Sequence, residues 1–136
     1  MILTYLAAYA ATAVVFLGLD YLWIAVLARD FYRQQLGPLM LEQPNLVAAG
    51  VFYALYVGGI LYFAILPALH GGGWAKALAA GAVLGLVAYG TYDLTNLATL
   101  KSWPVTTSFA DILWGIALTA TAATVGYAAA RLTAPL

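Results

Sequence analysis

The sequence has 136 residues, of which 65% are hydrophobic and only 7% are charged. Because a soluble domain needs roughly a quarter charged residues to cover its surface, this composition indicates a chain whose solvent is lipid. The five basic and five acidic residues balance and form no basic patch, which excludes a nucleic-acid-binding role. The absence of cysteine and the single histidine, His70, exclude disulfides, thiolate nucleophiles and a multi-histidine metal site.

Four long apolar runs follow one another along the chain, at about 2–28, 45–69, 75–100 and 105–130. Each exceeds the ~20 residues that a helix needs to cross a bilayer. The first run is too long for the apolar part of a signal peptide and has no Lys or Arg before it, so we interpret it as a retained span. The sequence therefore predicts an all-α polytopic membrane protein. Residues 1–136 would form a single integral membrane domain, a bundle of four transmembrane helices with both termini on the same side.

The connections between the predicted spans differ in length. The first, residues 29–45, holds four of the ten charged residues together with several apolar side chains. This mixture is typical of a short interfacial helix, and an ordered polar loop is an equal alternative. The second (HGGGWAK, 70–76) and the third (KSWP, 101–104) are tight turns, and each has a tryptophan suited to the aromatic belt of a membrane interface.

Three aspartates, Asp20, Asp93 and Asp111, lie inside the predicted spans. Each is about seven or eight residues from a span end that borders the first or third connection, which at 1.5 Å per residue is roughly 10–12 Å from one membrane face. A charged side chain in hydrocarbon costs roughly 2.5–3.5 kcal/mol by insertion scales. We therefore expect the three carboxyl groups to meet in one layer, where either some are protonated or a cation balances them. We also expect an arginine or lysine near that face to pair with one of them.

Aromatic and amide side chains occur at the same depth as the three aspartates. Tyrosines of the second and third spans can donate to a carboxylate, and Asp20 and Asp111 each have a tryptophan three residues later whose indole N–H can donate. An asparagine follows Asp93 by one helical turn. The candidate ligand-binding residues are therefore Asp20, Trp23, Tyr53, Tyr56, Tyr89, Tyr92, Asp93, Asn96, Asp111 and Trp114.

Small residues recur at every fourth position in three of the spans, a spacing that lets helices approach closely. They predict that these faces are packed against neighbouring helices and that Asp93 and Asp111, which lie on or beside them, point inward. The series are Gly50, Ala54 and Gly58 in the second span, Ala77, Gly81 and Gly85 in the third, and Gly115, Thr119 and Ala123 in the fourth.

Five segments together resemble a bacterial family of small four-span membrane proteins, known only as a predicted membrane protein of unknown function. They are LDYLW (19–23), FYRQQLG (31–37), VFYALY (51–56), TYDLTNLATLKSWP (91–104) and FADILWG (109–115). The resemblance covers nearly the whole chain and implies a multi-pass protein of the bacterial inner (cytoplasmic) membrane, without an established activity. Its members sometimes occur beside genes for fatty-acyl-modifying enzymes, such as cyclopropane synthase-like proteins, which implies an association with lipids. The motif residues it carries over are Asp20, Trp23, Tyr92, Asp93, Asn96, Asp111 and Trp114.

Binding is the function that these residues favour, with the polar layer holding a cation, a proton or the polar head of a lipid. Two alternatives stay open. One is a component of membrane-lipid (fatty-acyl) modification in which an aspartate acts as general acid or base. The other is a structural accessory subunit of a larger membrane complex, with the acids as hydrogen-bonding contacts between helices. No catalytic triad, phosphate loop or metal-ligand spacing occurs, so the sequence favours a non-enzyme without metal or cofactor. Its expected partners are membrane lipids and either a second copy or a membrane complex.

Overall fold

The computed structural model describes residues 1–134. The first membrane-length helix ends in a π-helical segment, and the second contains one in its interior. Helix α1 (Ile2–Leu22) continues into η1 (Trp23–Leu27). The second long helix consists of α3 (Leu46–Ile60), η3 (Leu61–Ile65) and α4 (Leu66–Leu69). A π-helical turn widens the backbone and changes the direction in which the following side chains point. The side chains before and after these segments therefore face different neighbours.

The third and fourth long helices are uninterrupted: α5 (Gly73–Thr99) and α6 (Val105–Thr133). All four are long and apolar enough to cross a membrane, which confirms the predicted fold class. The first connection contains α2 (Arg29–Leu36) and the 3-10 helix η2 (Gly37–Leu39). A short helix thus occupies the predicted place after the first span.

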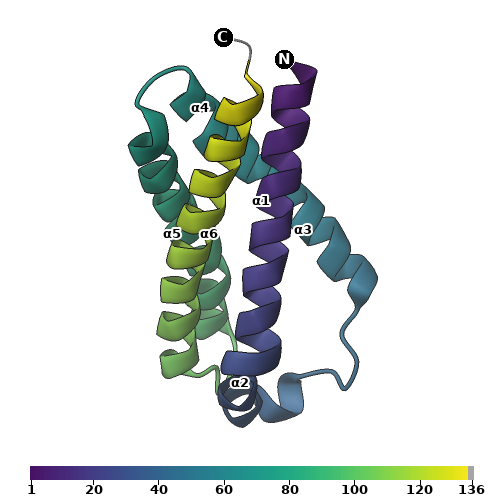
Figure 1. Ribbon diagram of the computed structural model, residues 1–136. Coiled ribbons are helices and arrows are strands. Elements are labelled where there is room, and N and C mark those ends of the chain that lie inside the picture. Colours follow the sequence, from purple (N-terminus) through teal and green to yellow (C-terminus); the bar gives the residue numbers. More distant parts are fainter. Residues whose placement is uncertain (135–136) are drawn as a thin grey trace.

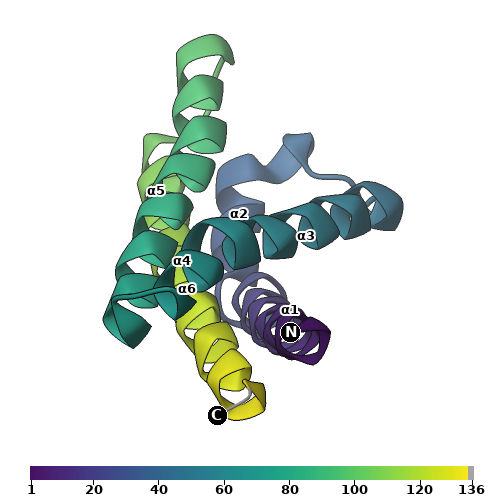
Figure 2. The ribbon, with the colours of Figure 1, turned by 90° about the horizontal axis from the view of Figure 1, so that it is seen from above.

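Helix α6 is the centre of the bundle, with α5 packed along one side and α1 along the other. Both chain ends lie at one end of the bundle, as predicted, and α2 lies at the opposite end below α1 (Figure 1). Helix α3 leans outward and packs mainly on α1. Seen from above, it runs away from α5 and α6, whereas its continuation reaches back over them (Figure 2). The second span is therefore anchored at its η3–α4 end.

Glycines bring α5 and α6 into backbone contact. A Cβ atom at Gly85 would overlap the carbonyl of Gly115, and one at Gly81 would collide with Ala123 and the backbone of Thr119. These contacts confirm the small-residue prediction for the third and fourth spans.

The corresponding prediction for the second span is wrong. A Cβ atom at Gly50 or Gly58 would meet nothing within 4 Å. The reason is the outward lean of α3, which keeps this face away from α5 and α6. Four-residue spacing of small side chains is frequent in any span rich in alanine and glycine, so the pattern alone does not identify a packed face.

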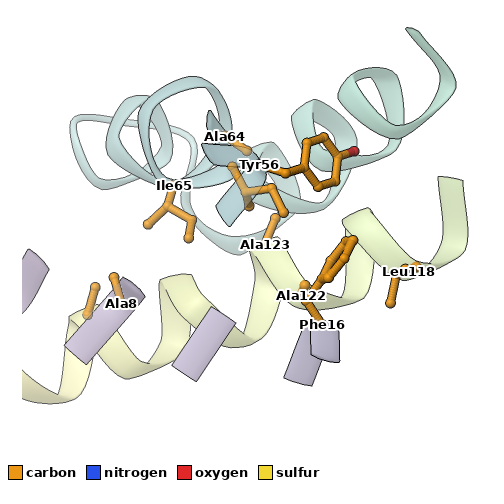
Figure 3. Close-up of a cluster of buried hydrophobic side chains, with 10 residues drawn as sticks. Ala8, Phe16, Tyr56, Ala64, Ile65, Leu118, Ala122 and Ala123 are labelled. Atoms are coloured by element: carbon orange, nitrogen blue, oxygen red, sulfur yellow. The ribbon is translucent and has the colours of Figure 1, made fainter. Parts of the chain in front are cut away.

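A hydrophobic core fills the half of the bundle nearer the chain ends (Figure 3). Phe16 of α1 packs edge-on against Tyr53 and Tyr56 of α3, with ring centroids 5.7 and 5.3 Å apart. Because Phe16 is one helical turn before Asp20, this core directly borders the level of the acids. Its labelled members in Figure 3 are Ala8, Phe16, Tyr56, Ala64, Ile65, Leu118, Ala122 and Ala123.

Candidate functional site

Asp20 joins three helices through its two carboxylate oxygens. The hydroxyl of Tyr53 on α3 donates to Oδ2 at 2.5 Å, and the indole Nε1–H of Trp114 on α6 donates to Oδ1 at 3.3 Å. The side chain is buried, with 5% of its surface exposed. Two neutral donors thus hold a carboxylate inside the bundle, and they replace part of the hydration that it loses there.

Asp111 is held by the first connection. The hydroxyl of Tyr32 on α2 donates to Asp111 Oδ1 at 2.7 Å, and the indole Nε1–H of Trp23 donates to the Tyr32 oxygen at 3.1 Å. Burial is the main cause that raises the pKa of the Tyr32 phenol, and the charges of Asp111 and Asp93 add to the rise, although the bond from Trp23 opposes it. Tyr32 therefore stays a neutral hydrogen-bond donor over the whole physiological pH range.

Asp93 differs from the other two acids because neither of its oxygens has a hydrogen-bond partner within residues 1–134. The residue is 0% exposed. Its carboxyl group is near enough to that of Asp111 for a hydrogen bond between them once one of the two carries a proton. The hydroxyl of Thr107, on α6 one turn before Asp111, is likewise buried without a partner in the described part of the chain.

Two cavities meet at Asp111. The first has a volume of about 370 Å³ and is lined by Asp20, Ile24, Phe52, Tyr53, Ala88, Tyr89, Tyr92 and Asp111. The second has a volume of about 250 Å³ and is lined by Ile24, Tyr32, Leu36, Met40, Tyr92, Asp93, Trp103, Thr107 and Asp111. Phe52 of α3 and Tyr92 of α5, which both line the first cavity, are 48% and 54% exposed. The first cavity therefore reaches the outer surface of the bundle beside these two side chains.

The tryptophans are exchanged relative to the predicted pairing. Trp23 and Trp114 stack face to face, with ring centroids 4.5 Å apart and planes at 8°. Trp114 donates to Asp20 of the other helix, and Trp23 reaches Asp111 through the hydroxyl of Tyr32. The stacked indoles therefore link α1 to α6, whereas the sequence predicted that each would support the aspartate of its own helix.

The structure brings most of the predicted residues together. One or both cavities are lined by Asp20, Tyr53, Tyr89, Tyr92, Asp93 and Asp111. Trp114 donates a hydrogen bond to Asp20, and Trp23 donates one to Tyr32, the partner of Asp111. The acids are arranged as a pair and a single residue: Asp93 lies beside Asp111, and Asp20 lies across the first cavity. Within residues 1–134, no group of three His, Cys, Asp or Glu side chains is close enough to hold a metal ion.

Two predicted residues neither line a cavity nor take part in the hydrogen bonds that hold the acids. Tyr56 is behind the first cavity, where its hydroxyl shares a hydrogen bond of 2.8 Å with Thr119. Asn96 is half-buried and lines neither cavity, and its side chain makes no hydrogen bond with another described residue. One helical turn beyond Asp93, it is nearer the end of α5 than the cavities are.

The predicted pairing of an acid with an arginine or lysine is wrong. The hydrogen bonds to Asp20 and Asp111 come from tyrosine and tryptophan, and no basic side chain of the described chain takes part in them. Neutral aromatic donors satisfy a carboxylate without removing a second charge from water, which makes them the less costly partners in a membrane.

Sequence reasoning missed Tyr32. The connection that contains it, residues 29–45, mixes charged and apolar residues, which predicts a short interfacial helix or an ordered polar loop. An arginine and an aspartate on the same helix, Arg29 and Asp30, are exposed whereas Tyr32 is buried. The strong amphipathicity of α2 is the signal that could have pointed to an inward tyrosine.

Replacing Tyr32 by phenylalanine tests its role as a neutral donor. We expect Tyr32→Phe to lower the free energy of unfolding by about 1–2 kcal/mol at neutral pH, because two hydrogen bonds are lost. Since the folded-state pKa of Tyr32 is raised, its contribution is present below about pH 10 and is lost as the pH rises through that folded-state pKa. The difference between the two proteins should therefore shrink in strong alkali. Thermal unfolding in detergent measures it, and a difference that grew with pH would contradict this assignment.

The comparisons with known proteins agree with the architecture. A family model described as "Predicted membrane protein (DUF2177)" matches residues 5–128, which include both cavities and all three acids. No curated protein and no solved structure matches the chain.

Proposed function

Since the chain belongs to the DUF2177 family of predicted membrane proteins, we propose that it binds a membrane amphiphile with a cationic head in the first cavity. The protein would act in the bacterial inner membrane, the location that its resemblance to a bacterial family implies. The observation that carries the proposal is a cavity of about 370 Å³ that combines two carboxyl groups with aromatic walls and has exposed side chains of two membrane-length helices in its lining.

The charges of the cavity favour a cationic head. Asp20 and Asp111 both line it, and none of its other lining residues is basic. An ionised carboxylate in low dielectric gains far more from a nearby cation than it would in water. Tyr53, Tyr89 and Tyr92 supply aromatic faces that attract a cation in addition.

The shape of the cavity favours an amphiphile over a free ion. Two of its lining side chains, Phe52 on α3 and Tyr92 on α5, are exposed on the outside of the bundle. A head group could enter there from the bilayer while its hydrocarbon chain stays among the lipid tails. The lining combines two carboxyl groups with apolar and aromatic side chains, which is the combination that an amphiphile requires.

A pair of single-chain amphiphiles tests the proposal. The purified protein in a neutral maltoside detergent is mixed with dodecyltrimethylammonium or with dodecyl sulfate, which differ in the charge of the head. We expect dodecyltrimethylammonium alone to bind saturably, as seen by native mass spectrometry and by a raised unfolding temperature. Asp111→Asn should weaken its binding roughly tenfold or more, because a charge-assisted contact contributes about 1.5–3 kcal/mol.

Asp30→Asn is the matched control, because Asp30 is an exposed aspartate of α2 that lines neither cavity. It should leave binding unchanged. Equal binding of the two amphiphiles would overturn the proposal. A folded Asp111→Asn protein that binds as well as the wild type and is only less stable would instead identify the acids as helix-packing contacts.

A further inference from the structure

Asp93 is the one acid of the site whose burial the proposed amphiphile site does not explain. It lines the second cavity, it is 0% exposed, and both oxygens lack partners within residues 1–134. A buried carboxylate without hydrogen bonds or a counter-ion costs several kcal/mol. A group in this position must therefore be neutral or share its charge with a neighbour.

The neighbours of Asp93 on every packed element are neutral or acidic. Asp111 on α6 lines the second cavity together with Asp93, and so do the phenols of Tyr32 on α2 and Tyr92 on α5. Asp20 on α1 lies farther away, across the first cavity, together with Tyr53 of α3 and Tyr89 of α5. None of these groups carries a positive charge, so two ionised carboxylates would stand side by side uncompensated.

A single proton supplies the hydrogen bond that Asp93 lacks and also removes one of the two adjacent negative charges. A carboxylic acid and a carboxylate in contact form a charge-assisted O–H···O hydrogen bond, in which the proton gives each group a partner. Tyr32 already donates to one oxygen of Asp111, which leaves the other oxygen for Asp93. A proton between the two carboxyl groups needs no additional space beside the fully buried Asp93.

We propose that Asp93 and Asp111 form a proton-binding site in which the two carboxyl groups share one proton, and that a cation bound in the first cavity displaces this proton. The shared proton depends only on the pair of Asp93 and Asp111, whereas its displacement by a cation rests on the proposed function. The exchange is balanced, because one cation enters and one proton leaves for the solvent. Asp111 couples the two events because it lines both cavities, and a cation beside it favours the ionised form.

Infrared spectroscopy of the purified protein tests the shared proton without any ligand. A protonated carboxylic acid gives a carbonyl band above the amide I band, which shifts to lower wavenumber in heavy water. We expect this band in the wild type at neutral pH. It should disappear in Asp93→Asn, where the asparagine amide can donate to an ionised Asp111. It should shift in Asp111→Asn, where the buried Asp93 stays protonated but loses the carboxylate with which it shares the proton. It should persist in Asp20→Asn, the matched control from the same site.

The absence of the band from the wild type, its survival in Asp93→Asn, or an unchanged band position in Asp111→Asn would overturn the shared proton whether or not an amphiphile binds. A pH-indicator dye in weakly buffered detergent solution then tests the exchange. Saturation with dodecyltrimethylammonium should release up to one proton per protein in the wild type and none in Asp93→Asn. If the amphiphile binds to the wild type but releases no proton, the coupling is wrong and the proposed binding function still stands.

Discussion

Gly85→Ala is expected to be among the most destabilising single-methyl substitutions in this protein. The added Cβ would overlap the carbonyl group of Gly115, and a backbone carbonyl cannot move aside as a side chain can. The helices must separate, which weakens the most extensive helix–helix contact in the molecule, between α5 and α6. We expect the free energy of unfolding in mixed micelles to fall by about 1–3 kcal/mol, the range for overpacked cores.

Gly18→Ala is the matched control for this substitution. Gly18 also lies within a long helix, but a Cβ there meets nothing within 4 Å. Alanine should then be neutral or stabilise by about 0.5–1 kcal/mol, because it restricts the unfolded chain more than glycine does. Equal effects at the two positions would show that α5 and α6 are not in backbone contact at Gly85.

Asp20→Ala is expected to destabilise the bundle by about 2 kcal/mol or more and to weaken amphiphile binding. The substitution leaves the hydroxyl of Tyr53 and the indole N–H of Trp114 without an acceptor. Hydrogen bonds to a charged group contribute about 1.5–3 kcal/mol in soluble proteins, and interhelical bonds in membranes average less. Because α3 has few other links to the centre of the bundle, the loss should also loosen that helix.

A double-mutant cycle separates the hydrogen bond from other effects. Asp20→Ala, Tyr53→Phe and the double variant are compared by unfolding in the same micelles, and a coupling energy of about 1 kcal/mol or more is expected. Asp30→Ala on the exposed face of α2 should change stability by no more than about 0.5 kcal/mol. A coupling energy near zero would mean that the contact between Asp20 and Tyr53 does not stabilise the bundle.

The four helices and the level of the acids were predictable from sequence for simple physical reasons. Bilayer thickness sets a minimum length for an apolar run, and helical rise converts a residue's distance from the end of the run into depth. Asp20, Asp93 and Asp111 could therefore be placed at one level without knowing how the helices pack. The sequence could not reveal that Asp93 pairs with Asp111 while Asp20 lies apart, because that depends on how each helix is rotated.

The partners of the acids were harder to predict because they come from other elements. Trp114 was expected to serve Asp111, one turn away, yet it donates to Asp20 on α1. Tyr32 is not among the predicted site residues, because the connection that contains it is expected at the membrane interface, and only the folding of α2 under the bundle brings it to Asp111. In both cases the hydrogen-bond partner is on another helix, so spacing within one helix could not identify it.

The stacked indoles of Trp23 and Trp114 have a spectroscopic consequence. Two parallel rings with centres 4.5 Å apart couple their electronic transitions, so they should give a paired signal in the near-ultraviolet circular dichroism spectrum. Each ring comes from a different helix, which means that the signal exists only while those helices are together at this depth. The protein thus carries an intrinsic, label-free reporter that can be followed while lipid composition or acidity is varied.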